Sequence, residues 1–180
     1  VLHAYSQYPT GSQKLFFTSN HDENSWNGTE YEKYGKAAKA LAVFTFTWSG
    51  MPLIYCGQES PNNKRLQFFD KDLIEWKEPL QLQDFYTSLS QLHHSKAISE
   101  GETFILPSEN EGILAFVRRK ENDVVLVLLN LSDSDKIKIS VEHEWLKGKF
   151  KNIFSELSYS FSQKEEFELQ RFEYLIYQSV

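Results

Sequence analysis

Asn20, His21 and Asp22 are the adjacent residues of this sequence whose side chains are best suited to chemistry. They follow an apolar run rich in aromatic residues, Lys14–Thr18, which is typical of a buried parallel strand. The carboxyl ends of parallel strands are where α/β barrels place their catalytic residues. An ionised carboxylate at such a place accepts short, charge-assisted hydrogen bonds. The segment therefore predicts a chemically active site at the end of a strand.

The elements that position these residues alternate between strand and helix over the first hundred residues. Lys14–Thr18 and Pro52–Cys56 are predicted to be strands. Apolar residues at three- and four-residue spacing predict two helices, one that begins near Tyr31 and is stopped by Gly50, and one over about Leu82–Ala97. Two strand-helix units of this kind would form a quarter of an eightfold barrel.

The pattern changes after Gly101 to short strand-like runs separated by polar residues or glycine. The run Val124–Asn130 is almost continuously apolar and predicts a central strand buried on both faces. The run Lys136–Val141 alternates, so one of its faces is expected to meet solvent. Runs at this spacing predict an antiparallel sandwich. The predicted strands are Thr103–Leu106, Ile113–Arg119, Val124–Asn130, Lys136–Val141, Phe150–Phe154 and Phe172–Gln178.

Two segments resemble the alpha-amylase family of glycoside hydrolases. Phe17–Asp22 is similar to the Asn-His-Asp motif after the seventh barrel strand, and Gly50–Glu59 is similar to the last barrel strand, which ends in Gly-x-Glu. The resemblance implies an α/β plus all-β chain: a partial TIM (β/α)8 barrel, of which the last two β/α units are present, followed by an antiparallel β-sandwich domain. The expected domains are residues 1–100 and 101–180.

The resemblance also assigns roles to individual residues in a retaining hydrolase that acts on α-glucosidic bonds. Asp22 is expected to grip hydroxyls of the sugar being cleaved and to favour its distorted ring, through hydrogen bonds that strengthen in the transition state. His21 is expected to donate to a hydroxyl of the same sugar, and Asn20 to hold the strand end. Trp26 and Tyr55 are candidate stacking platforms, and Trp26 is the better of the two because it lies in the loop beside the motif. Glu59 is expected to support the site without reacting. The implied ligand is a starch-type α-glucan or a maltooligosaccharide.

Two of these residues also have a simpler interpretation. Asp22 would, taken alone, cap the loop before the next helix, and His21 would be a partly buried histidine bonded to backbone. A metal site is not expected, although His21, Asp22 and Glu23 are all ligand types, because adjacent residues rarely converge on one ion. No cofactor is expected.

The family's nucleophilic Asp and general-acid Glu have no counterpart in the 180 residues, and no Gly-Phe-Arg-x-Asp-like segment occurs. The chain also starts at Val1 without a signal-peptide pattern. We therefore expect the C-terminal portion of a longer enzyme, inactive on its own. The alternative is a non-catalytic, carbohydrate-binding or scaffold member of the family. The open strand edges of a quarter barrel are expected either to drive self-association or to leave that segment loosely ordered.

Composition excludes other classes of function. The net charge is −6 and the 19 Lys and Arg residues are scattered, so nucleic acid is not an expected partner. No apolar run approaches the ~20 residues that cross a bilayer. Cys56, the one cysteine, excludes an intrachain disulfide and is expected to be buried and inert because it lies in a strand pattern.

Overall fold

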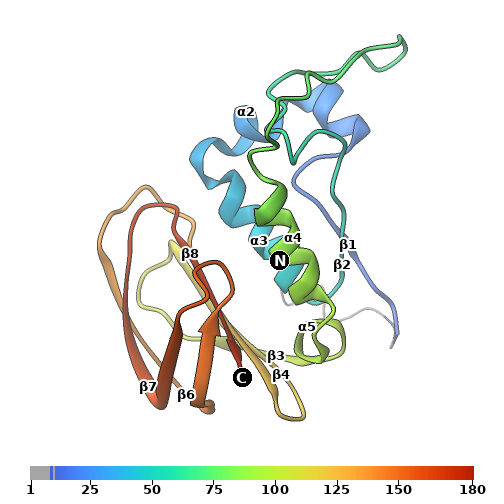
Figure 1. Ribbon diagram of the computed structural model, residues 1–180. Helices are drawn as coiled ribbons and strands as arrows, with labels where there is room; N and C mark the ends of the chain where they lie inside the picture. The colour runs from blue at the N-terminus through green and yellow to red at the C-terminus, as the bar shows by residue number, and fades with distance from the viewer. Residues whose placement is uncertain (1–8, 10) are drawn as a thin grey trace.

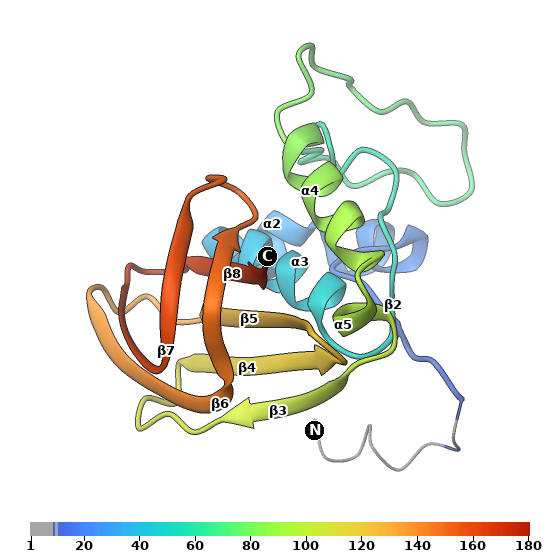
Figure 2. The same ribbon diagram turned by 60° about the horizontal axis from the view of Figure 1, so that its bottom comes forward.

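The computed structural model describes residue 9 and residues 11–180 (Figure 1). A small parallel sheet with its helices is followed by a six-stranded antiparallel sheet that curls over its own core (Figures 1 and 2). The predicted combination of an α/β segment with an all-β domain is therefore confirmed at this level. The helical elements are η1 (Glu23–Asn27), α2 (Glu30–Tyr34), η2 (Gly35–Ala37), α3 (Ala38–Thr47), α4 (Gln83–His93) and α5 (Lys96–Ser99).

The small sheet consists of β1 (Leu15–Phe16) and β2 (Met51–Pro52), which pair in parallel. Both strands are shorter than the sequence predicts, because each has only the other as a partner in the described chain. Gly50 precedes β2 with a φ of +151°, and a Cβ at this position would lie 2.5 Å from the carbonyl oxygen of Lys14. The absence of a side chain at Gly50 therefore allows the segments of β1 and β2 to approach each other. Parallel pairing places the loops that follow β1 and β2 at the same end of the sheet.

The helix predicted from Tyr31 is divided into α2, η2 and α3. Thr29 and Glu32 form a capping box that starts α2. Gly35 ends it with φ 54° and ψ −128°, a conformation that glycine tolerates. The second predicted helix is divided in the same way, because Ser95 leaves the helical conformation and its hydroxyl accepts from the backbone N–H of Ile98 to start α5.

The six-stranded sheet has the order β3-β4-β5-β8-β6-β7 and is antiparallel throughout. The predicted sandwich of two sheets is corrected to one continuous sheet. Its long strand β6 pairs with β7 over most of its length, shifts register between Glu142 and Lys147, and pairs with β8 only through Phe150–Asn152. This bent strand also contacts β3, β4 and β5, which closes the curl. The strands are β3 (Glu102–Leu106), β4 (Ile113–Lys120), β5 (Asp123–Asn130), β6 (Ile137–Asn152), β7 (Ser158–Leu169) and β8 (Tyr174–Ser179).

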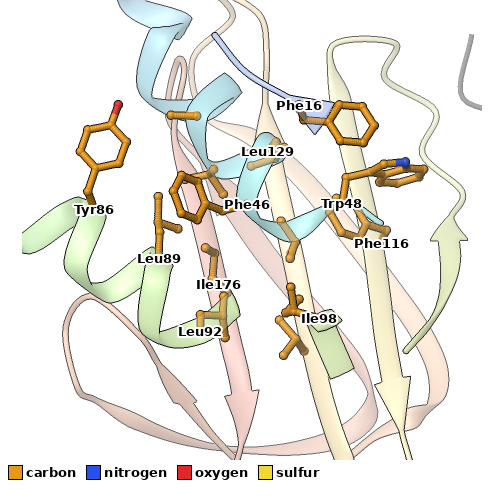
Figure 3. Close-up of a cluster of buried hydrophobic side chains, with 14 of the residues drawn as sticks. Phe16, Phe46, Trp48, Tyr86, Leu89, Leu92, Ile98, Phe116, Leu129 and Ile176 are labelled. Carbon is orange, nitrogen blue, oxygen red and sulfur yellow. The ribbon is translucent and has the colours of Figure 1, made fainter. Parts of the chain in front are cut away.

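The strand β5 is buried on both faces, as its apolar run predicts. Alternate side chains serve two hydrophobic clusters, because successive residues of a strand point to opposite faces. Leu126 and Leu128 face the inside of the curl, whereas Val127 and Leu129 face the helices α3, α4 and α5. Figure 3 shows this second cluster, in which residues of the first hundred positions pack on β4, β5 and β8. The helical segment and the sheet therefore share one hydrophobic core.

Cys56 is exposed, which corrects the expectation of a buried thiol. It follows β2 in a turn, and no further strand of the described chain covers it.

Candidate active site at the ends of β1 and β2

The segment after β1 begins with a turn that Asn20 organises. The side-chain Oδ1 of Asn20 accepts a hydrogen bond of 2.8 Å from the backbone N–H of Glu23, and its carbonyl oxygen accepts one of 2.9 Å from the N–H of Asn24. Asn20 thus caps the helical turn that carries the next residues. Between these anchors, the side chains of His21 and Asp22 are 71% and 61% exposed, and their Nε2 and Oδ2 atoms lie 3.6 Å apart. Both groups are free to meet a ligand.

Asn24 joins this turn to the loop that follows β2. Its side chain is buried, donates to the carbonyl oxygen of Lys64 at 3.2 Å and accepts from the N–H of Leu66 at 2.8 Å. A side-chain amide can hydrogen-bond both a backbone C=O and a backbone N–H of another segment, as the backbone of a neighbouring strand would. The contact fixes two segments that are forty residues apart in the sequence, and it brings Phe68 and Phe69 to the site.

An open aromatic cluster contacts His21, the neighbour of Asp22. The ring of Phe68 packs against Trp26, with centroids 5.3 Å apart, and stacks on His21 at 6.1 Å. Phe69 contacts Trp26 at 6.2 Å and Phe68 at 4.9 Å. Trp26 is 58% exposed and Phe69 is 84% exposed, which is unusual for rings of this size. We call Trp26, Phe68 and Phe69 the aromatic platform.

Ion pairs hold the two loops that carry the platform. Lys33 donates to Glu23 at 3.0 Å, and this hydrogen bond holds the pKa of the Glu23 carboxyl below its usual value. Arg65 lowers the pKa of Glu32 in the same way, through a contact of 2.9 Å between its Nε and Oε2. Glu23, although next to Asp22, is therefore engaged with a cation.

A buried polar cluster lies under the site and joins the ends of the two strands. The Gln58 amide donates to Thr18 Oγ1 at 2.8 Å, to Glu30 Oε2 at 2.7 Å and to the hydroxyl of Tyr86 at 3.3 Å. Its Oε1 accepts from the N–H of Tyr55 at 2.6 Å. Thr18 also donates to Glu30 Oε2, at 2.7 Å. Burial raises the pKa of the Glu30 carboxyl, and burial followed by the charge of Glu30 raises that of the Tyr86 hydroxyl.

Glu59 lies apart from the aromatic platform. It lines a cavity of about 370 Å³ on α4, together with Tyr86 and His94, and its Oε2 is buried without a hydrogen-bond partner in the described residues. The charge of Glu59 contributes, after burial and other charges, to the raised pKa of Tyr86.

The structure thus brings together three of the residues singled out in the sequence: His21, Asp22 and Trp26. Asn20 turns its amide back to the chain, and Glu59 faces α4. Sequence reasoning missed the polar cluster under the site and the link made by Asn24. Their only signal in the sequence is the position of polar residues just after the two predicted strands.

Neither a metal site nor a membrane span is found in the part of the chain that the structure describes. No three His, Cys, Asp or Glu residues among residue 9 and residues 11–180 are grouped so that they could hold a metal ion. None of the helices over the same residues has both the length and the apolar character needed to cross a bilayer.

The β-sheet region matches a known family. The family model described as the maltogenic amylase C-terminal domain matches residues 103–176. Among curated proteins, the chain is 27% identical to Alpha-amylase 2 of Dictyoglomus thermophilum over 169 residues, 87% of this chain and 28% of that protein. It is 30% identical to alpha-amylase MalA of Haloarcula japonica over 132 residues, 68% of this chain and 19% of that protein. The chain spans less than a third of the length of these relatives.

Solved structures share the fold over almost the whole chain. The maltogenic alpha-amylase AmyB from Thermotoga neapolitana superposes with a TM-score of 0.76 at 19% identity, over 98% of this chain and 43% of that one. The alpha-amylase of Geobacillus thermoleovorans, solved in complex with acarbose, gives 0.77 at 16% identity, over 98% and 41%. The E221Q variant of AmyP, solved with maltotriose, gives 0.68 at 16% identity, over 98% and 43%.

Proposed function

We propose, from the premise that this chain carries the C-terminal region of the alpha-amylase family, that it forms part of a retaining glycoside hydrolase acting on α-glucosidic bonds. The proposed substrate is a starch-type glucan or a maltooligosaccharide. The observation that carries the proposal is the placement of Asp22: an exposed carboxylate at a parallel strand end, beside an exposed aromatic platform.

This arrangement suits a sugar because a pyranose ring carries polar hydroxyls on its edge and apolar C–H groups on its face. The hydroxyls on the edge donate to carboxylates, and an ionised carboxylate accepts charge-assisted bonds. The C–H groups on the face pack against aromatic rings. Asp22 serves the first need, with His21 next to it, and Trp26 and Phe69 serve the second.

Asp22 is proposed to bind hydroxyls of the sugar whose bond is cleaved and to strengthen these bonds as the ring distorts. A retaining mechanism also needs a nucleophile and a general acid about 5–5.5 Å apart. Glu23 is paired with Lys33, and Glu59 faces α4. We therefore infer that both groups come from further barrel strands, which would pair with the open edges of β1 and β2.

The test is Asp22→Asn in the complete enzyme. The amide keeps the size of the side chain but loses the charge, so kcat should fall by several orders of magnitude while the circular dichroism spectrum is unchanged. Asp70→Asn, the same change at an exposed position of the loop that carries the platform, is the matched control and should leave kcat within about twofold. Normal kcat with only a raised KM for Asp22→Asn would make Asp22 an ordinary binding residue and overturn its assigned role.

A non-catalytic, carbohydrate-binding or scaffold role is the second candidate, because the aromatic platform alone would support binding without chemistry. The two candidates differ in the complete protein. A protein that binds maltoheptaose through Trp26 but shows no turnover above a mock purification would favour the binding role.

A further inference from the structure

A second polar and aromatic cavity lies away from the aromatic platform. Its volume is about 740 Å³, and it is formed by the start of α4, the turn between β6 and β7, and the start of β8. None of its lining residues belongs to the loop after β1, and none belongs to the part of the β2 loop that carries Phe68 and Phe69. The size is in the range of sites that hold small organic ligands. We call this cavity the rear groove.

Aromatic rings form the walls of the rear groove. Phe85 of α4 stacks on Phe154 with an interplanar angle of 11° and a centroid distance of 5.6 Å. Tyr174 packs edge-on against both rings, at 5.7 and 5.4 Å. Tyr159, at the start of β7, is 39% exposed and rests edge-on against the buried Tyr177 at 5.2 Å. The rings hold one another in place, so the groove is built before a ligand enters.

Polar side chains line the rear groove together with these rings. Asp84 and Ser88 lie four residues apart on α4, and neither side chain has a hydrogen-bond partner among the described residues. The hydroxyls of Tyr159 and Tyr174 likewise have none in that part of the chain. These groups are available to hydrogen-bond a ligand with several hydroxyls.

The charges of the rear groove argue for a neutral ligand. Asp84 and Glu173 are acidic, and Lys39, whose ammonium lies 5.9 Å from the centre of the Phe85 ring, is the one cation that lines the groove within the described chain. A phosphate or a nucleic acid would meet two carboxylates here and would be repelled. A polyhydroxylated ring would stack on the aromatic walls and donate to the same carboxylates.

We propose that the rear groove is a second binding site for an α-glucan chain, distinct from the site of Asp22. The α-linkage of the glucan is inferred from the proposed function. The inference that a sugar binds here comes from the polar and aromatic lining alone. The helix α4 shares its hydrophobic cluster with the strand β1 that precedes Asp22. A glucan held in the rear groove would therefore be tethered at a fixed distance from Asp22, which raises its effective concentration there.

Binding of maltoheptaose to the 180-residue chain, measured by calorimetry, tests the proposal. All measurements are made in a Trp26→Ala background, which removes the central ring of the aromatic platform. Tyr159→Ala and Asp84→Asn should each weaken the remaining binding by about tenfold. Tyr34→Ala, which removes an exposed tyrosine that does not line the rear groove, should leave it unchanged. Cellohexaose, a β-linked chain, should bind at least about tenfold more weakly than maltoheptaose.

Three outcomes would overturn the proposal. The first is maltoheptaose binding that Tyr159→Ala and Asp84→Asn leave unchanged. The second is no measurable binding in the Trp26→Ala background. The third is a change in oligomeric state with Tyr159→Ala, seen by size-exclusion chromatography without an effect on sugar binding, which would make the groove a contact between copies. None of these touches the test of Asp22 in the complete enzyme, so the two proposals fail separately.

Discussion

Arg118 of β4 joins the helical segment to the sheet, and its replacement gives a quantitative prediction. Its side chain is fully buried, and its guanidinium donates to the carbonyl oxygens of Thr47 at 3.2 Å and of Gly101 at 2.7 Å. Thr47 is the last residue of α3, where the helix dipole favours a cation. Gly101 links α5 to β3. We predict that Arg118→Met weakens the attachment of the helices to the sheet.

The magnitude follows from two opposing effects on Arg118. Burial lowers the pKa of the guanidinium from its ordinary value to about 10, which corresponds to a cost of about 3 kcal/mol at ~1.36 kcal/mol per pH unit. Two hydrogen bonds from a charged donor stabilise by about 1.5–3 kcal/mol each. Methionine keeps an apolar stem but removes both the cost of burying the charge and the two hydrogen bonds. We therefore expect the free energy of unfolding to fall by about 1–2 kcal/mol. Arg118→Ala also removes the packed methylenes and should cost about 2 kcal/mol more.

Urea unfolding followed by circular dichroism and by tryptophan fluorescence measures both effects. Trp48 reports on the helix–sheet contact, because it is buried with its ring 5.0 Å from that of Phe116. Arg171→Met is the matched control: Arg171 is exposed and its guanidinium lies 3.6 Å from Asp133 and 3.4 Å from Asp135 at the surface, so its loss should cost about 0.5 kcal/mol or less. If Arg118→Met is as stable as the unaltered chain, burial of the charge outweighs its hydrogen bonds and the reasoning is wrong.

Three further predictions concern the site and its loops. Because burial raises the pKa of Glu30, the unaltered chain should lose stability relative to Glu30→Gln as the pH rises through 4.5 toward the raised value. Urea unfolding from about pH 3 to pH 8 should show a difference in unfolding free energy between the two chains that is constant below about pH 4, changes over that window and is constant again above it. The 180-residue chain alone should not hydrolyse maltooligosaccharides, and turnover that survives repeated chromatography would contradict the need for further carboxylates. Limited proteolysis should cut first within residues 61–79, a long exposed stretch without helix or strand, and mass spectrometry that finds earlier cuts within α3 or α4 would contradict the shared core.

Local patterns in the sequence predicted the elements well but not their ends. The three- and four-residue spacing indicated helices in the right places, yet Gly35 and Ser95 interrupt them through their own conformational preferences. The doubly buried strand β5 was predicted correctly because both of its faces are covered. The sequence could not distinguish one curled sheet from two packed sheets, because both would show the same succession of strand-like segments. The register shift between Glu142 and Lys147, where β6 bends, has no signal in the apolar pattern.

The candidate residues of the site were easier to find in the sequence than the contacts that support them. Asp22 and Trp26 stand within a few residues of each other, so a local pattern was enough to place them in one site. Gln58 and Thr18 are forty residues apart in the sequence, and no local pattern around either residue predicts their hydrogen bond. Cys56 was assigned to a buried strand because its neighbours are apolar, but the pairing with β1 ends before it.

The long-range contacts at the site explain how an exposed carboxylate can be held in place. Gln58 fixes the end of the β1 segment to the end of the β2 segment, and Asn24 fixes the loops beyond them. These buried amides, rather than contacts of Asp22 itself, restrict the backbone on which Asp22 stands. Asp22 therefore keeps its oxygens available to a ligand while its position is restrained, which is what pre-organised recognition requires. Gln58→Ala should accordingly lower kcat in the complete enzyme, although Gln58 does not touch the substrate. Gln58→Glu keeps an acceptor for the N–H of Tyr55 but loses the N–H groups that donate to Thr18 and Glu30, so it should not restore kcat.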